Sequence, residues 1–461
     1  MIFQHSCMSH ATAWRGEETS ATMPTVVMPV YLGSGSVAFG LDATGMQGLD
    51  ARVAEQPEVV STVHMQAHRA DDLMVRHAGT LSKHHQIDQI LSGVQDIVER
   101  EDNWSMLPAG WFDYVLTVDG RRYDAEAIAA AARDWRRSFE PASGCCTTQF
   151  DLEGLRIRWR AGIGPGSPIG LFPCEVQSLV GQAREVELRV RVHLTTRRGE
   201  TITSDGLTSE LADGFTGLQW DAETATSTAP VKQPYRLCWA LSLGGNSRGV
   251  WDEKAVLECS RRVSVGDASA VLPVAIFFGC SKAGTGDLNE ARKTLGSVDR
   301  SWTEEWNAVE NGWAAYFSQA ATYDIGDPAS EYVFHVNQYL LAAGADWLWG
   351  IPCNYLWLDN FQGSTFWDSF FMVDGMLRAG HADRVRLFVQ WLAETAMQKD
   401  DPRPFYWIHY ADGVPYRTDD IAYQVMAAHA GSAIRYYEET HDQEALRRWV
   451  YPICLRVAQY T

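Results

Sequence analysis

The feature that most constrains the fold of this chain is a change of hydrophobic periodicity near Cys280. Between residues 26 and 280, apolar side chains alternate with polar ones, as in Leu155, Ile157 and Trp159, which are separated by arginines. This period is typical of antiparallel strands with one buried face. After Cys280, apolar residues recur every three to four positions, which is the helical period. The sequence therefore predicts a β-rich part followed by an α-helical part.

The chain of 461 residues is longer than one hydrophobic core normally supports, so at least two large domains are expected. Many short strands over roughly 250 residues favour an antiparallel β-sandwich. The predicted organisation is a variable or disordered leader over residues 1–23, a β-sandwich domain over 24–285, a helical linker over 286–325, and a partial (α/α)6-type domain over 326–461.

Particular segments make this organisation specific. Residues 186–194 alternate like a half-buried strand, and the continuously apolar residues 271–278 predict a strand covered on both faces. In the linker, residues 287–294 predict a short helix, and Ser301 and Glu304 have the spacing of a capping box. After this cap, tryptophan and phenylalanine recur at helical spacing and would form one apolar helix face: Trp302, Trp306, Trp313 and Phe317.

Helix boundaries in the last third follow from caps and breakers. Asp327 and Pro328 suit the first positions of a helix with its buried stripe at Tyr339 and Ala343. Two further helices are expected over residues 366–379, ending at Gly380, and over residues 383–398. Another is expected from a cap at Asp419 through Tyr437. A last one begins at a cap at Asp442 and is divided by Pro452.

Charge and cysteine content exclude several classes of protein. Thirty-nine basic residues against 58 acidic ones give a net charge of −19, which repels nucleic acid and anionic membranes. The nine cysteines form no CxxC pair, which favours reduced thiols and a cytoplasmic location. The first 24 residues lack the apolar core of a signal peptide, and no segment reaches the roughly 18 apolar residues of a membrane span.

Two other patterns have structural explanations. Residues 33–38 read Gly-Ser-Gly-Ser-Val-Ala, a loose dinucleotide-binding pattern, but strand and turn residues follow where a helix is required. We interpret them as a glycine-rich turn between strands. His64 and His68 lack nearby cysteine or carboxylate partners, so no metal site is predicted.

Trp367 and Asp368 lie in an aromatic segment, residues 363–371, at the start of an expected helix. A flat ring packs on the C–H face of a sugar, while a carboxylate accepts hydrogen bonds from its hydroxyls. The residues alone leave two interpretations open. One is a sugar site, and the other is a core cluster in which Asp368 only caps the helix.

A second polar cluster precedes the next long helix. Asp419 and Asp420 follow an aromatic run that contains Trp407. One aspartate is expected to cap the helix and the other to face a cleft, which makes Asp420 and Trp407 further candidates for sugar binding. From the residues alone, a solvated helix start is the favoured interpretation of this cluster.

These segments resemble glycoside hydrolase family 65, whose members are inverting disaccharide phosphorylases and α-glucosidases with an (α/α)6 barrel. The resemblance rests on Trp367-Asp368, on residues 419–423 opening a helix that continues to 442, and on the order of β domain, linker and helices. It implies that Trp367 and Asp368 hold the non-reducing sugar. Ser369-Phe370 stand where the family has an acidic residue, so the preferred substrate stays open.

The resemblance also implies that the general acid lies in later helices. Twelve barrel helices need roughly 190 residues, whereas 137 remain from Ile325 to Thr461. We therefore expect an incomplete barrel without the general acid, and no catalytic residue is assigned. No cofactor is expected, and inorganic phosphate would be a co-substrate of a phosphorylase. A small carbohydrate is the expected partner, with a homo-oligomer also open.

Three functional hypotheses follow. The first is an inverting α-glucoside hydrolase or phosphorylase, and the alternative is a sugar-binding protein or inactive paralogue that does not cleave. A polysaccharide lyase is disfavoured, because lyases place their helices first and because the chain is strongly acidic, which does not suit an anionic polysaccharide.

Overall fold

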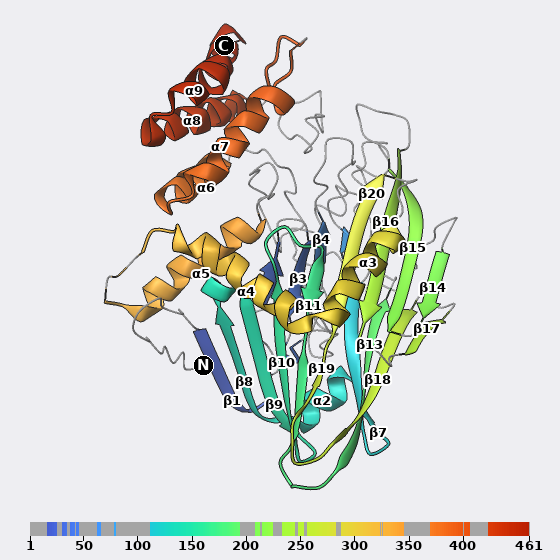
Figure 1. Cartoon of the computed structure of the whole chain (residues 1–461). Coiled ribbons are helices and arrows are strands. Elements are labelled where there is room, and N and C mark those ends of the chain that lie inside the picture. Colours follow the sequence, from blue (N-terminus) through green and yellow to red (C-terminus); the bar gives the residue numbers. More distant parts are fainter. Residues whose placement is uncertain are drawn as a thin grey trace.

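The computed structural model divides the chain into a β-rich part and a later helical part, as the two periods predict (Figure 1). The structure describes residues 16–24, 30–34, 37–41, 43–45, 62–65, 78–79, 111–193, 208–212, 214–224, 233–244, 248–252, 256–282, 287–322, 324, 326–344, 369–399, 401–405 and 423–460.

The larger sheet has eleven strands, and all its pairings are antiparallel. Its main path runs through β1 (Gly16–Thr22), β8 (Arg133–Glu140), β9 (Cys145–Leu152), β10 (Leu155–Ile163), β11 (Ile169–Leu171), β20 (Ala275–Lys282), β16 (Gln233–Ser242), β15 (Phe215–Thr224) and β14 (Thr208–Ala212). Off this path, β12 (Cys174–Ser178) pairs with β10 and with β19 (Ala270–Leu272).

A second antiparallel sheet contains β17 (Arg248–Asp252), β18 (Val256–Val265), β13 (Arg184–His193), β6 (Trp111–Val118) and β7 (Arg121–Tyr123), in that order. A smaller sheet contains β2 (Val30–Gly33), β3 (Val37–Leu41), β4 (Thr62–Met65) and β5 (Ala78–Gly79). Strands therefore flank the glycine-rich turn at residues 33–38, with Gly33 paired to Ala38. This pairing confirms the interpretation of a turn between strands.

The two larger sheets pack face to face through aromatic side chains. Tyr114 of the second sheet contacts Trp159 of the first, with ring centroids 4.7 Å apart, and Phe112 lies 6.4 Å from Trp239. Leu155, Ile157 and Trp159 are at most 1% exposed, so the alternating pattern is confirmed in β10. The core between the sheets is the interior that the sequence predicts for a β-sandwich.

The continuous strand predicted over residues 271–278 is wrong. The segment is divided into β19 and β20 by Pro273 and Val274. Proline has no backbone N–H to donate to a ladder, so it ends the first pairing. The segment is also not covered throughout, because Val271 is 51% exposed while Ile276 is fully buried.

Residues 16–22 are not part of a disordered leader. They form β1, which pairs with β8 along its length. Glu18 of β1 lies 2.9 Å from the buried guanidinium of Arg137 in β8. Polar side chains occupy most of β1, which removed the hydrophobic signal by which a strand is recognised in a sequence.

The linker forms two helices that cover the larger sheet (Figure 1). Helix α3 (Asp287–Arg300) is longer than predicted and contacts β15, β16 and β20. Helix α4 (Trp302–Ser318) buries Trp306 and Trp313, which confirms the predicted aromatic face. The capping box does not form, because the Ser301 hydroxyl donates to the Ser297 carbonyl, 3.2 Å away in α3.

Helix α5 (Pro328–Gly344) extends the first core beyond the sandwich. The ring of Tyr339 is fully buried, and its centroid lies 4.5 Å from that of Trp313. The Tyr339 hydroxyl accepts a hydrogen bond from the Gly33 amide at 3.1 Å, and Trp313 donates to the Ile163 carbonyl at 2.8 Å. The domain boundaries at residues 285 and 325 stay predictions, and α5 shares the core of the β-rich part.

The later helices form two layers around a second core. One layer contains α6 (Ser369–Arg378) and α8 (Tyr423–Thr440). The other contains α7 (Ala382–Trp391) with the π-helical turn η3 (Leu392–Ala396), and α9 (Gln443–Ala445), the π-helical turn η4 (Leu446–Val450) and α10 (Tyr451–Tyr460). Trp391 and Trp449 are the bulkiest members of the core between the layers.

Helix ends agree with the sequence at two positions and differ at another. Gly380 has φ of 91° after α6, and Asp442 accepts a hydrogen bond from the Ala445 amide at 2.9 Å, so both predicted ends are confirmed. Pro452 does not divide a helix. The π-helical turn η4 precedes it, and the widened turn accommodates a residue without an amide donor, so the helical chain continues to Tyr460.

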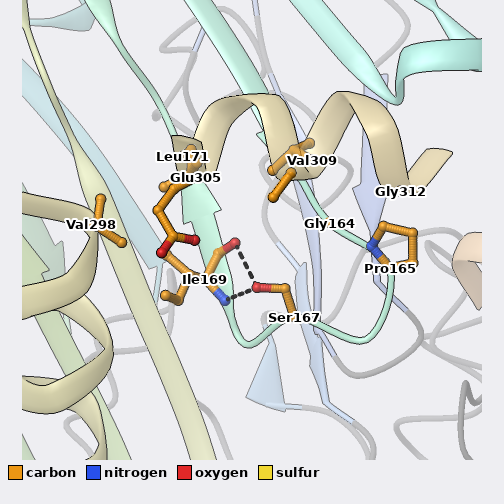
Figure 2. A pocket seen from close by; sticks show the side chains of 10 residues that line it. Gly164, Pro165, Ser167, Ile169, Leu171, Val298, Glu305, Val309 and Gly312 are labelled. Carbon is orange, nitrogen blue, oxygen red and sulfur yellow. Dashed lines mark hydrogen bonds between the residues drawn. The ribbon is translucent and has the colours of Figure 1, made fainter. Parts of the chain in front are cut away.

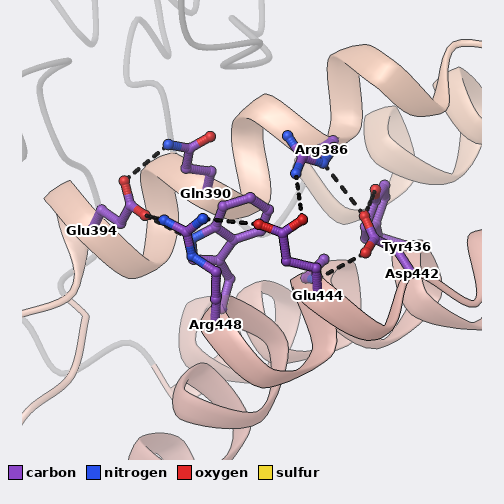
Figure 3. A network of polar contacts seen from close by, with 9 residues as sticks. Arg386, Gln390, Glu394, Tyr436, Asp442, Glu444 and Arg448 are labelled. Carbon is purple, nitrogen blue, oxygen red and sulfur yellow. Dashed lines mark hydrogen bonds and ion pairs between the residues drawn. The ribbon is translucent and has the colours of Figure 1, made fainter.

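A polar network joins the helices of the second layer (Figure 3). Trp449 donates to Glu394 at 2.7 Å, and the guanidinium of Arg386 lies 4.7 Å from the centre of the Trp449 ring. Arg386 also contacts Asp442 at 3.4 Å, and Arg448 contacts Glu394 at 3.5 Å. Arg386 thus meets Asp442, and Glu394, farther along the chain, meets Trp449, which is also farther along. The segment of α7 and η3 therefore runs parallel to the segment of α9 and η4.

We expect Tyr339→Phe to destabilise the protein by about 1 to 3 kcal/mol, because it leaves the buried Gly33 amide without its acceptor. The aromatic contact with Trp313 is retained. Urea unfolding followed by tryptophan fluorescence measures the effect. Tyr451→Phe is the matched control, since Tyr451 is 60% exposed. Equal midpoints for both variants would show that the hydroxyl does not stabilise this junction.

Candidate functional site

The four residues predicted to bind sugar are Trp367, Asp368, Trp407 and Asp420, and all lie outside the described residues. Asp419 and residues 366–368 of the expected helix also lie outside them. The nearest described positions in the sequence are Ser369, the first residue of α6, Tyr423, the first residue of α8, and Phe405. The site is therefore built from these two helices.

Helices α6 and α8 run parallel and in close contact. A side chain at Gly431 would come within 3.1 Å of the Phe370 ring, so glycine permits this approach. Four residues farther along each helix, Arg435 donates to Asp374 at 2.8 Å. The amino-terminal ends of both helices therefore lie at the same end of the pair, and α8 extends about 12 Å beyond Phe370 at the rise of a helix.

This end of the helix pair combines exposed aromatic rings with a buried hydroxyl. Phe371 is 60% exposed and Tyr423 is 57% exposed. Ser369 is fully buried, and among the residues that the structure describes its hydroxyl has no hydrogen-bond partner. His429 is also buried, with its ring edge-on to Phe405 at 4.9 Å. Apolar ring faces and a hydroxyl are groups that a sugar site can use.

An ion-pair cluster fixes the register of the two helices farther from this end. Asp374 accepts hydrogen bonds from Arg378 at 2.7 Å and from Arg435 at 2.8 Å. Both hydrogen bonds lower the pKa of Asp374, and that from Arg378 has the larger effect. Glu438 contacts Arg435 at 3.0 Å and balances the second guanidinium. The carboxylate of α6 thus holds α8 in place.

A separate cleft of about 410 Å³ lies between α4 and the connection from β10 to β11 (Figure 2). Its polar groups include the Glu305 carboxylate, which accepts a hydrogen bond from Ser297 at 3.1 Å, and the Ser167 hydroxyl, which accepts from the Ile169 amide at 3.1 Å. The remaining lining residues are small or apolar: Gly164, Pro165, Ile169, Leu171, Val298, Ala308, Val309 and Gly312.

The sequence analysis did not find this cleft. Its lining residues have no spacing or chemistry that distinguishes them from core and turn residues, and they come together only when α4 packs on the sheet. Among the described residues that line it, Glu305 is the single carboxylate and its hydrogen bond is already made, so these residues do not form an acid and base pair.

The described cysteines Cys145, Cys146, Cys174, Cys238, Cys259 and Cys454 are free thiols in the structure. Burial raises the pKa of Cys146 to about 11 and that of Cys145 to about 12. The thiolate is the reactive form of cysteine, so these two side chains are inert at neutral pH.

Within the described ranges, no three His, Cys, Asp or Glu side chains come together as metal ligands would. None of the helices in this part of the chain has the length and apolar character needed to cross a bilayer.

We expect Asp374→Asn to lower stability at pH 7 by about 1 kcal/mol, because two guanidinium groups lose their partly buried carboxylate. A carboxylate with a lowered pKa stabilises the fold above its ordinary pKa, and this contribution is lost as the pH falls through the pKa of the folded state. The difference between variant and parent in urea midpoint should therefore shrink towards pH 3. Glu439→Gln, at an exposed position of α8, is the control.

Comparison with family models gives no match for the sequence, and comparison with curated proteins gives none either. Solved structures do match. One described as "Putative kojibiose phosphorylase from human microbiome" aligns over 100% of this chain and 60% of its own, with TM-score 0.64 and 10% identity.

Two other solved structures are less similar. A bacterial glucoamylase complexed with acarbose aligns over 98% of this chain and 59% of its own, with TM-score 0.47 and 10% identity. A family GH92 α-mannosidase from Bacteroides thetaiotaomicron aligns over 92% and 54%, with TM-score 0.37 and 11% identity. The chain thus spans about 60% of the length of the first structure. Over that span it has the glycoside phosphorylase-like fold that the resemblance implies.

Proposed function

We propose that this chain binds the non-reducing glucosyl unit of an α-glucoside at the amino-terminal end of α6 and α8. The observation that carries the proposal is the likeness of its fold, along the whole chain, to the structure described as "Putative kojibiose phosphorylase from human microbiome". The parallel arrangement of α6 and α8 supports it, because both predicted segments precede the same end of this helix pair in the sequence.

In this proposal, Asp368 and Trp367 form the wall that grips the sugar. Asp368 is joined directly to the first residue of α6. The amino terminus of a helix carries a partial positive charge, which favours an ionised carboxylate beside it. An ionised carboxylate accepts hydrogen bonds from two neighbouring hydroxyls, and the indole of Trp367 supplies an apolar face for the ring.

Trp407 and Asp420 form the second wall. Trp407 follows Phe405, which packs on His429 of α8, and Asp420 precedes the first residue of α8 by three positions. Two carboxylates and two indoles would then approach a sugar from two segments. The net charge of −19 does not disfavour this ligand, because a glucosyl unit is neutral.

The reaction we propose for the complete site is cleavage of the α-glucosidic bond with inversion. A carboxylic acid protonates the leaving oxygen while water or inorganic phosphate attacks the opposite face of the sugar, and in an inverting hydrolase the two carboxyl groups stand about 6.5 to 9.5 Å apart. Asp368 and Asp420 bind hydroxyls in this scheme and transfer no proton. The reaction requires no cofactor.

Sugar binding without cleavage is the second candidate function. The same walls would hold the sugar, and the acid and base would be missing from the bound complex. Product analysis with kojibiose, maltose and trehalose, with and without phosphate, separates the two candidates. Release of glucose or glucose 1-phosphate identifies the enzyme, and unchanged disaccharide together with measurable binding identifies the binding protein.

We expect Asp368→Asn to weaken the binding of kojibiose at least tenfold, because a hydrogen bond to a charged group contributes about 1.5 to 3 kcal/mol. Isothermal titration calorimetry measures this loss. Trp367→Leu should weaken binding to a similar degree by removing the flat ring.

Asp134→Asn is the matched control, since Asp134 is an exposed aspartate of β8. Its backbone φ is 50°, a conformation that asparagine also tolerates. It should bind like the parent. Equal affinity of the parent and the Asp368→Asn variant would refute the assignment of Asp368. Absence of heat with every disaccharide would refute sugar binding by the chain as a whole.

A further inference from the structure

The two hydrophobic cores meet where the end of α4 packs against the turn between α6 and α7. The Ala321 amide donates to the Ala379 carbonyl at 2.7 Å, which joins the segment after α4 to the end of α6. Gly380 has φ of 91°, and a Cβ there would lie 2.7 Å from the Gln319 carbonyl oxygen. Only glycine suits this close backbone approach.

His381 fills this junction from the helical side. It precedes α7 directly, and its ring stacks on that of Tyr316 in α4, with centroids 3.7 Å apart and planes 11° apart. The side chain is 1% exposed. Burial lowers the pKa of His381 to about 4, Arg384 adds to this effect, and Asp383 opposes it.

His335 also contacts the end of α4. It belongs to α5, is fully buried, and lies edge-on to Phe317 of α4 at 6.4 Å. Its Nδ1 is 3.2 Å from the Gln338 side-chain oxygen, and Gln338 donates to the Ala321 carbonyl at 3.5 Å. Burial lowers the pKa of His335 to about 4, while Gln338 and Glu331 oppose the shift.

The end of α4 carries no charged side chain. Residues 314–321 are Ala, Ala, Tyr, Phe, Ser, Gln, Ala and Ala. Among the described residues, Asp383 of α7 is a carboxylate that acts on His381, and Glu331 of α5 is one that acts on His335. An imidazolium ion at either position would therefore be buried against apolar and neutral groups of α4, which is unfavourable.

We propose that this junction is an acid-sensitive hinge: protonation of His381 releases the helical layers from α4, and protonation of His335 loosens α5 against the same end of α4. The docked state requires both rings to be neutral, whereas a solvated histidine takes up a proton near pH 6.5. Docking is thus fully stable above about pH 6.5 and weakens as the pH falls towards the lower pKa of the docked state. Within this pH range, each histidine lowers the equilibrium constant for docking by about tenfold per pH unit.

The hinge would act on the amino-terminal end of α6, at Ser369. That helix runs from Ser369 to the junction at Ala379 and Gly380, so a change at the junction is transmitted along one rigid helix of ten residues. The proposal does not depend on which ligand binds there. It concerns how the helical layers are held to the rest of the chain.

Hydrogen exchange measured by mass spectrometry on the full chain tests the hinge. Protection of the peptide that contains Ala321 should fall by about 15-fold for each histidine between pH 6.5 and pH 5, after correction for intrinsic exchange. Peptides from the middle of α8 should keep their protection, because the second core stays folded. Equal losses in both regions would indicate general unfolding and overturn the proposal.

Variants separate the histidines from other acid effects. His381→Phe keeps a flat ring on Tyr316, and His335→Asn keeps a donor towards Gln338. The double variant should retain its protection at Ala321 down to pH 5. His441→Asn removes an exposed histidine with φ of 52° and should open like the parent. Acid opening that persists in the double variant would overturn the hinge.

The unaltered protein provides an independent measurement if a variant fails to fold. Exchange of the histidine C2 hydrogen reports the pKa of each ring. His381 and His335 should titrate below pH 5 and exchange slowly. Titration of these two rings near pH 6.5 would overturn the proposal.

Discussion

The contact on which the architecture most depends is that between Trp313 of the linker and Tyr339 of α5. Trp313 is bonded to the Ile163 carbonyl of β10, and Tyr339 is bonded to the Gly33 amide of β2. A side chain at Gly144 would come within 2.2 Å of the Trp313 ring, so the turn between β8 and β9 also fits closely against it. Two aromatic residues thus anchor the first helices to the β-rich part, and the later helices build on that support.

The periodicity of the sequence determined the large divisions of the fold, because each period reflects burial along one element. Alternation identified β10 and β13, and the helical spacing of tryptophans identified the buried face of α4. The errors arose where local chemistry depends on distant partners. β1 is polar and is held by pairing with β8, and the Ser301 hydroxyl turns to α3 instead of capping α4. Neither partner can be recognised in a single sequence.

The candidate site illustrates the same limit. The sequence selected residues by their chemistry, but it contained no sign that α6 and α8 run parallel in contact. That arrangement depends on Gly431, which permits the approach of Phe370, and on Arg435, which reaches Asp374 across the pair. The likeness to a solved structure at 10% identity shows that the fold as a whole is compatible with very different side chains. Function must therefore be argued from the residues at the helix ends.

Strongly perturbed titratable groups often mark functional positions. Among the described histidines of this chain, the lowered pKa values belong to His335 and His381, which lie at the joint between the two cores and outside the cleft beside α4. A structural joint needs no titratable ring, since phenylalanine would pack on Tyr316 without the cost of burying an imidazole. The physical consequence of histidine at both positions is that the joint responds to protons.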